Sequence, residues 1–142
     1  MKSLLLLIAF IGALTVSNVM VPSVSNAANA AKKERAVMSF SEPIRLMGAE
    51  LKGEYLFVHN DEAMARGEAC TYVYKGTAEN VNNLVISFHC MPMAAPRARY
   101  FRVRAGLNMS GQYEITEYQF AGSSEVHLVP LNHHTAHVTI SN

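Results

Sequence analysis

Residues 70–90, CTYVYKGTAENVNNLVISFHC, indicate the fold class of this chain. Two segments rich in Tyr, Val, Ile and Phe, residues 70–75 and 84–90, flank a run of turn-forming residues from Gly76 to Asn83. Strand-forming residues on either side of such a run are typical of a β-hairpin. We therefore predict a hairpin, with the midpoint of its turn at Asn80.

The predicted hairpin brings the two cysteines of the chain face to face. In this register the opposing pairs are Cys70 with Cys90, Tyr72 with Phe88, and Tyr74 with Ile86. An even number of cysteines in an exported chain favours a disulfide, so we predict a Cys70–Cys90 bond. The alternative is a pair of free thiols that serve a metal ion or redox chemistry, although the CxxC spacing of dithiol exchange is absent.

Further strand-like segments extend on both sides of the hairpin. With the hairpin strands included, they are residues 36–40, 43–47, 53–59, 70–75, 84–90, 98–105, 112–120, 125–130 and 135–140. Turn residues such as Lys52-Gly53 separate several of them. This spacing predicts an all-β fold, an antiparallel β-sandwich or small barrel of about 7–9 strands.

One segment has the signature of a short helix. Asn60 and Asp61 are good helix caps, the residues that follow favour helices, and Gly67 is suited to end one. We predict a short helical turn near residues 61–66.

The N-terminus has the features of a secretory signal peptide. Lys2 precedes an apolar run, residues 4–16, that is short for a membrane span, and small residues before Ala27 and Ala30 suit cleavage. We therefore predict a signal peptide at residues 1–30, a flexible leader at 31–35 and a single β domain at 36–142. The expected location is periplasmic or extracellular, with no stable membrane span after cleavage.

The charge of the expected mature chain is balanced. Without Lys2 the twelve basic residues become eleven, which equals the number of acidic residues. Because nucleic-acid binding needs a cationic excess, this balance argues against a nucleic-acid partner. A protein or a small molecule is the expected kind of partner.

Residues 43–55, PIRLMGAELKGEY, resemble the opening of small exported bacterial β proteins that are uncharacterised. In those proteins a strand, a turn ending in leucine and Gly-x-Tyr begin the sheet. The resemblance implies export and β structure, and it transfers no functional site.

Ligands suited to a soft metal follow the predicted hairpin. If the strand continues past Cys90, its period of two places His89, Met91 and Met93 on one face. Imidazole and thioether ligands suit Cu(I), and His59 and His127, near strand ends, are candidates to complete such a copper site. The alternative is structural, because Pro92 often ends a strand and methionines fill cores.

A second histidine cluster lies near the C-terminus. His133 and His137 share a face of the last predicted strand, beside His134. This arrangement permits adventitious metal binding, but a polar tail segment is its commoner meaning.

Catalytic motifs are absent from the sequence. It contains no nucleophile elbow, no His-Glu-x-x-His and no glycine-rich nucleotide loop, and Asp61 is its only aspartate. We expect no enzyme. Alternation in residues 98–105 places Tyr100, Arg102 and Arg104 on one polar face, which is a candidate partner-binding stripe or an ordinary solvated face.

Two functional hypotheses therefore emerge from the sequence. The first is an exported, non-enzymatic β-sandwich that acts as a binding or structural module without a cofactor. The alternative is a copper-binding protein that uses His and Met side chains.

Overall fold

Alternating strands and tight connections make up the part of the chain, residues 32–130, that the computed structural model describes. The elements are β1 (Lys33–Leu46), β2 (Ala49–Asn60), α1 (Asp61–Ala65), β3 (Thr71–Lys75), the 3-10 turn η1 (Val81–Asn83), β4 (Leu84–Phe88), β5 (Met91–Ala94), β6 (Arg102–Leu107), β7 (Tyr113–Gln119) and β8 (Glu125–Leu128). The predicted all-β fold with one short helix is confirmed.

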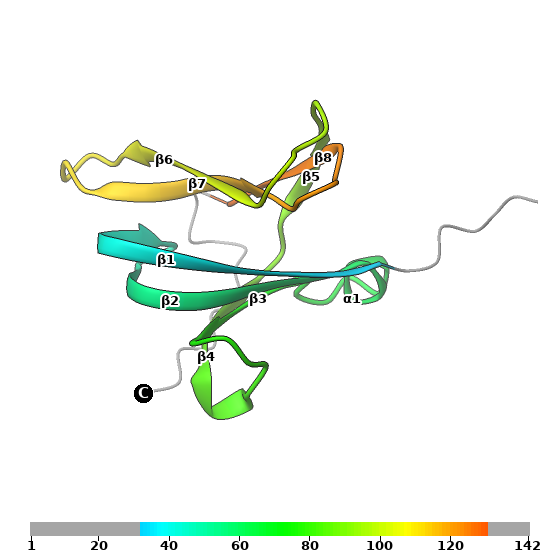
Figure 1. Cartoon of the computed structure of the whole chain (residues 1–142), viewed down its shortest axis with the longest axis horizontal. Coiled ribbons are helices and arrows are strands. Elements are labelled where there is room, and N and C mark those ends of the chain that lie inside the picture. The colour runs from blue at the N-terminus through cyan, green and yellow to red at the C-terminus, as the bar shows by residue number, and fades with distance from the viewer. Residues whose placement is uncertain (1–31, 131–142) are drawn as a thin grey trace, which may run out of the picture.

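The strands form one curled sheet of eight strands in the order β4-β3-β2-β1-β7-β8-β5, and β6 pairs with β7. In Figure 1, β6 and β7 lie above β1 and β2, so the curled sheet makes two layers. All pairs are antiparallel except β1 with β7, which are parallel at Arg45 and Glu114. The sheet is therefore mixed, whereas the sequence predicted a purely antiparallel one.

A long hairpin of β1 and β2 forms the centre of the lower layer. Its turn is Met47-Gly48, both with positive φ, as a type I′ hairpin turn requires. Residues 36–40 and 43–47, predicted as two strands, belong to one strand with a bulge between Phe40 and Ile44. Gly53, predicted as a turn residue at the start of the strand 53–59, lies inside β2 opposite Phe40, next to the bulge.

The strand β1 also begins earlier than predicted. Lys33 and Arg35, assigned to a flexible leader, pair with β2, and both bind the carboxylate of Glu79. The pairing with β2 and the shared contact with Glu79 explain why β1 already begins at Lys33.

The hairpin of β3 and β4 is confirmed, but its predicted register is wrong by one residue. Thr71 faces Phe88 and Val73 faces Ile86, and a bulge follows Val73. Because Tyr74 faces Leu84, the midpoint of the turn is Glu79 and not Asn80, whose side chain caps η1. A shift of one residue exchanges the two faces of a strand, so Val73 is buried while Tyr72 is only partly buried.

The helix α1 follows β2 as the sequence predicted. The Asn60 side chain accepts hydrogen bonds from the backbone N–H groups of Glu62 and Ala63 at 3.0 and 3.4 Å. This N-cap ends β2 and starts the helix at Asp61.

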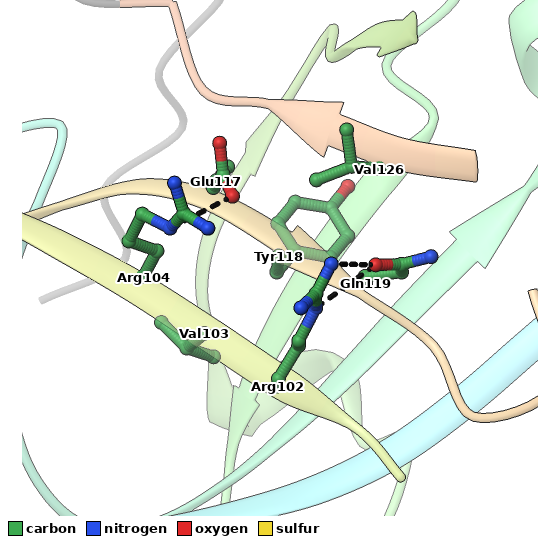
Figure 2. A pocket seen from close by; sticks show the side chains of 7 residues that line it. All are labelled: Arg102, Val103, Arg104, Glu117, Tyr118, Gln119 and Val126. Atoms are coloured by element: carbon green, nitrogen blue, oxygen red, sulfur yellow. Dashed lines mark hydrogen bonds and ion pairs between the residues drawn. The ribbon is translucent and has the colours of Figure 1, made fainter. Parts of the chain in front are cut away.

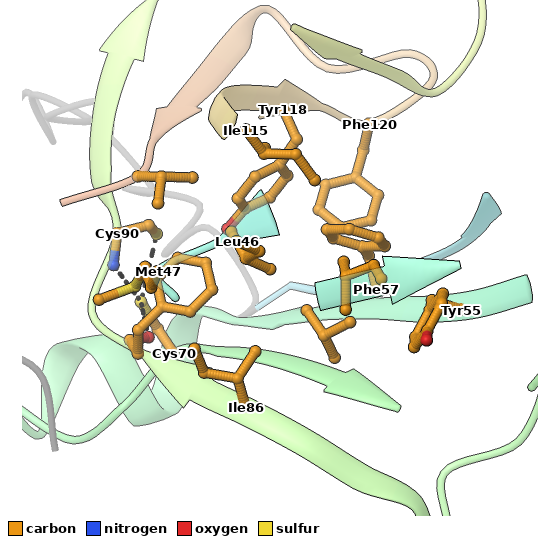
Figure 3. Close-up of a cluster of buried hydrophobic side chains, with 14 residues drawn as sticks. Leu46, Met47, Tyr55, Phe57, Cys70, Ile86, Cys90, Ile115, Tyr118 and Phe120 are labelled. Atoms are coloured by element: carbon orange, nitrogen blue, oxygen red, sulfur yellow. Dashed lines mark hydrogen bonds between the residues drawn. The ribbon is translucent and has the colours of Figure 1, made fainter. Parts of the chain in front are cut away.

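Aromatic and aliphatic side chains fill the space between the layers. Phe57 on β2 packs against Tyr118 on β7, with ring centroids 5.8 Å apart, and against Phe101 at 5.4 Å. Figure 3 shows this core, with Cys70 and Cys90 at one end of it.

Among residues 32–130 no helix has the length and apolar character needed to cross a bilayer. The predicted signal peptide and the predicted strand at residues 135–140 lie outside the described residues.

Candidate metal centre

Three buried side chains from different parts of the sheet converge at one end of the core. His59, Cys90 and His127 each offer one ligand atom, and these atoms lie within 4.8 Å of one another. The two imidazoles are fully buried, and Cys90 is 5% exposed. Nitrogen and sulfur donors at this spacing match the ligands that Zn²⁺ and copper prefer.

Sheet pairing explains why these side chains meet. His59 is the last residue but one of β2. His127 on β8 faces Tyr118 of β7 across the ladder, and Cys90 lies in the short link between β4 and β5. The cluster therefore joins both layers of the curled sheet.

Cys70 lies beside this cluster and is not bonded to Cys90. Both cysteines are free thiols with their Sγ atoms 3.2 Å apart, more than an ångström beyond the length of about 2.05 Å of a disulfide bond. The predicted disulfide is thus corrected to a close pair of thiols. The strand pairing ends at Thr71 and Phe88, so Cys90 is not held opposite Cys70 by the ladder.

Each thiol has a further polar neighbour. The Cys90 backbone N–H donates to Cys70 Sγ at 3.4 Å, and Cys90 Sγ lies 3.4 Å from His127 Nδ1. The hydrogen bond from Cys90, assisted by His59, lowers the pKa of the Cys70 thiol, and the same contact with Cys70 raises the pKa of Cys90. A metal ion would bind the thiolate form of these side chains and displace their protons to solvent.

Packing holds the His127 imidazole in the neutral form that can bind a metal. Its ring stacks on Tyr118 with centroids 5.0 Å apart and planes 15° apart, and it lies 4.2 Å from the ring of His59. Burial, followed by the repulsion of His59, lowers the pKa of His127 to about 4. The stack also fixes the plane of the imidazole.

The outer sides of both imidazoles face carboxylates. His59 Nδ1 is 3.2 Å from Asp61 Oδ1, and His127 Nε2 is 3.8 Å from Glu125 Oε1 and 4.0 Å from Glu34 Oε2. None of these contacts meets the geometry of a hydrogen bond. Since Nδ1 of His59 faces Asp61, its Nε2 is the nitrogen left for the cluster, while His127 uses Nδ1. A carboxylate behind each metal-binding imidazole is a common arrangement in metal sites.

The structure brings together only part of the copper set suggested by the sequence. His59 and His127 meet, but Met91 and Met93 are 54% and 51% exposed. On β5 it is Pro92 that faces His127, so the methionines, which face Leu128 and Val126, lie on the opposite side of the ribbon.

His89 also stands apart from the three converging ligands. It is only partly buried, and its Nδ1 lies 3.8 Å from Cys70 Sγ. It therefore contacts Cys70 and is not one of the three converging ligands. The tail histidines His133, His134 and His137 fall outside the described residues.

The predicted stripe of Tyr100, Arg102 and Arg104 is not continuous. The two arginines share an exposed face of β6, but Tyr100 precedes the strand. Arg102 Nε donates to Gln119 Oε1 at 2.9 Å, and Arg104 Nε pairs with Glu117 Oε1 at 3.1 Å (Figure 2). Both guanidinium groups are thus engaged within the domain.

The sequence favoured a disulfide at Cys90, with a free thiol that serves a metal ion as the alternative, and it did not group Cys90 with His59 and His127. A usable signal was present in the spacing of acids and histidines. Glu125 and His127 are two apart on one strand, and His59 and Asp61 are two apart at a strand end. Such spacing can place a carboxylate beside an imidazole.

Comparison of this chain with protein families, with curated proteins and with solved structures finds no match.

Proposed function

We propose that this domain is an exported, non-enzymatic module that binds one transition-metal ion through His59, Cys90 and His127, with Cys70 as the fourth ligand. The observation that carries the proposal is the convergence of three buried ligand atoms within 4.8 Å. The chemistry shared by these donors suits Zn²⁺ and Cu⁺.

The distances support a compact site with four ligands. At typical bond lengths a tetrahedral Zn²⁺ site has neighbouring N and S ligands about 3.6 Å apart and two S ligands about 3.8 Å apart. The Cys90–His127 and Cys70–Cys90 distances are 3.4 and 3.2 Å. These two distances are a few tenths of an ångström shorter than those around a bound ion, and Cys70, which is not among the ligand atoms that lie within 4.8 Å of one another, would also have to move toward the ion.

The cost of leaving these groups without a ligand also supports the proposal. Both nitrogens of His59 and Nε2 of His127 are buried without a hydrogen bond. A buried polar group without a partner costs about 1–3 kcal/mol. A metal ion bound at the inner nitrogens would also strengthen the attraction of the outer N–H groups to their carboxylates.

Burial favours a binding role over catalysis. The contact between Cys90 and His127 has the composition of a nucleophile and its base, but both side chains are buried. Four protein ligands would leave no open position for a substrate, as in structural zinc sites. Export is proposed from the N-terminal sequence alone.

The test is a competition titration of the untagged, reduced mature chain, kept free of oxygen. We expect one Zn²⁺ or one Cu⁺ per chain, with the two ions measured in separate arms. The three tail histidines are replaced by Asn in every protein, so that adventitious binding at the tail does not contribute.

Two variants and one control locate the site. C90S and H127Q each remove a ligand and are expected to weaken binding at least tenfold, a loss seen when metal sites are perturbed. The control M91L/M93L, which removes both thioethers of β5, is expected to leave affinity unchanged. Unchanged binding in C90S, or loss of binding in the control, would contradict this assignment.

A further inference from the structure

A surface hollow of about 400 Å³ lies next to the buried histidines. Its lining consists of Lys32, Glu34, Asp61, Gly122, Ser123, Ser124 and Glu125. Three carboxylates thus face one ammonium group, and Lys32 already pairs with Glu34. The hollow has an excess of negative charge although the chain as a whole is close to neutral.

The fold places these carboxylates around the imidazoles by regular sheet geometry. Glu34 on β1 faces His59 on β2 in the register of the hairpin, so the two side chains share a face. Glu125 lies two residues before His127 on β8 and shares its face. Asp61 is the first residue of α1, immediately beyond β2.

A buried nitrogen of the candidate metal centre lies close to two of the carboxylates that line this hollow. His127 Nε2 is fully buried, makes no hydrogen bond, and lies 3.8–4.0 Å from the carboxylates of Glu125 and Glu34. The exposed fractions of the carboxylate side chains fall from 46% at Glu125 through 36% at Asp61 to 9% at Glu34. Each acid thus lies directly beside one of the imidazoles, and two of the three remain open to solvent.

From this arrangement we propose that the negative charge of the hollow concentrates a divalent cation beside the candidate metal centre and so speeds its uptake, Zn²⁺ in preference to Cu⁺. The inference rests on the proposed function. Carboxylate oxygens bind Zn²⁺ well, whereas Cu⁺ favours sulfur ligands. A cleft lined by one sign of charge also raises the local concentration of its counter-ion and the rate of association, by about 10- to 1000-fold.

The test is the kinetics of metal uptake by the mature chain with the tail histidines replaced. Co²⁺ serves as the divalent probe, because bound thiolates give it a charge-transfer absorption that stopped flow can follow. The variant E34Q/D61N/E125Q removes the three charges and keeps similar shapes. The control E50Q removes one charge at the opposite end of β2, next to the Met47-Gly48 turn.

We expect the association rate constant of Co²⁺ to fall at least tenfold in the triple variant and its dependence on salt to weaken. The dissociation rate is also expected to rise, because the substituted carboxylates support the imidazoles from behind, so the association rate constant alone tests the inference. E50Q should behave like the parent chain, and Cu⁺ uptake should be insensitive to the triple substitution.

The outcomes that contradict the inference differ from those that contradict the proposed function. An unchanged association rate with a faster dissociation rate would show that the carboxylates orient the imidazoles without guiding the ion, and would overturn the inference alone. Equal slowing of Cu⁺ and Co²⁺ uptake would overturn the preference for a divalent ion. If the parent chain binds neither ion, the proposed function itself fails.

Discussion

His127 combines three contacts that suit a metal ligand and are costly without one. Its ring is stacked on Tyr118, its Nδ1 meets the Cys90 thiol, and its Nε2 points to carboxylates without a hydrogen bond. If His127 only filled the core, an apolar side chain in its place would make the domain more stable, because buried polar groups without partners are unfavourable. The arrangement therefore favours a role in binding.

The low pKa of His127 predicts that the metal-free domain loses stability in mild acid. Burial and His59 hold the folded-state pKa at about 4, whereas the unfolded chain has a pKa of about 6.5. Between these two pKa values only the unfolded state binds the proton. The contribution of His127 to the free energy of unfolding is therefore complete above pH 6.5 and is lost as the pH falls toward 4. The expected contribution is about 3 kcal/mol.

Urea unfolding in the presence of a chelator, at several pH values from 4.5 to 7, measures this effect. H127Q removes the titrating group, so its stability is expected to vary less with pH than that of the parent chain. The same pH dependence in both proteins would show that His127 does not carry the effect.

At the scale of the elements, the two layers are linked by a buried hydrogen bond close to the candidate metal centre. The hydroxyls of Thr71 on β3 and Tyr118 on β7 are in hydrogen-bond contact, and both residues are fully buried. Tyr118 also stacks on His127. The bond thus helps to position β7, and with it an imidazole of the candidate site.

A double-mutant cycle tests this bond between β3 and β7. T71V and Y118F each leave a buried hydroxyl without its partner, which costs about 1–3 kcal/mol. The double variant is expected to lose less stability than the sum of the two, since neither hydroxyl remains. Chemical unfolding measures all four proteins.

Y72F is a matched control for this cycle. The Tyr72 hydroxyl donates to the Ala69 carbonyl at 2.6 Å, but the side chain is only partly buried, so a smaller loss is expected. Strict additivity of T71V and Y118F would contradict a direct bond between the layers.

The cap of α1 predicts a second effect at this scale. Asn60 satisfies the first backbone N–H groups of the helix that carries Asp61. N60A is expected to lower the free energy of unfolding by about 1 kcal/mol. Urea unfolding measures the loss, and an unchanged midpoint would show that this short helix does not depend on its cap.

For the molecule as a whole, the sequence predicted the class of fold and the positions of most strands. The hairpin of β3 and β4 was recognisable because its strands are rich in Tyr, Val and Ile around a polar turn. The register of the hairpin was not recognisable, because the cap at Asn80 and the bulge after Val73 depend on local hydrogen bonds that composition does not show.

The candidate site was only partly predictable for a similar reason. His59 and His127 were recognised as possible ligands, but their meeting depends on how the sheet curls and brings β8 beside β7. The exposure of Met91 and Met93 follows from the pairing of β5 with β8, which the sequence did not indicate. Long-range pairing therefore decides which of the suggested ligands converge.

Metal binding is expected to raise the stability of the whole domain. An ion that binds only the folded state, present at 100 times its dissociation constant, stabilises that state by about 2.7 kcal/mol. Thermal unfolding of the reduced chain with and without Zn²⁺ measures the shift. C90S should show a much smaller shift at the same Zn²⁺ concentration, and an equal shift would place the ion elsewhere.

X-ray absorption spectroscopy of the Zn²⁺-loaded mature chain, with the tail histidines replaced, tests the central claim most directly. The account predicts two sulfur ligands at about 2.3 Å and two imidazole nitrogens at about 2.0 Å, with one sulfur lost in C90S. A first shell of oxygen and nitrogen without sulfur would contradict a metal centre built on His59, Cys90 and His127.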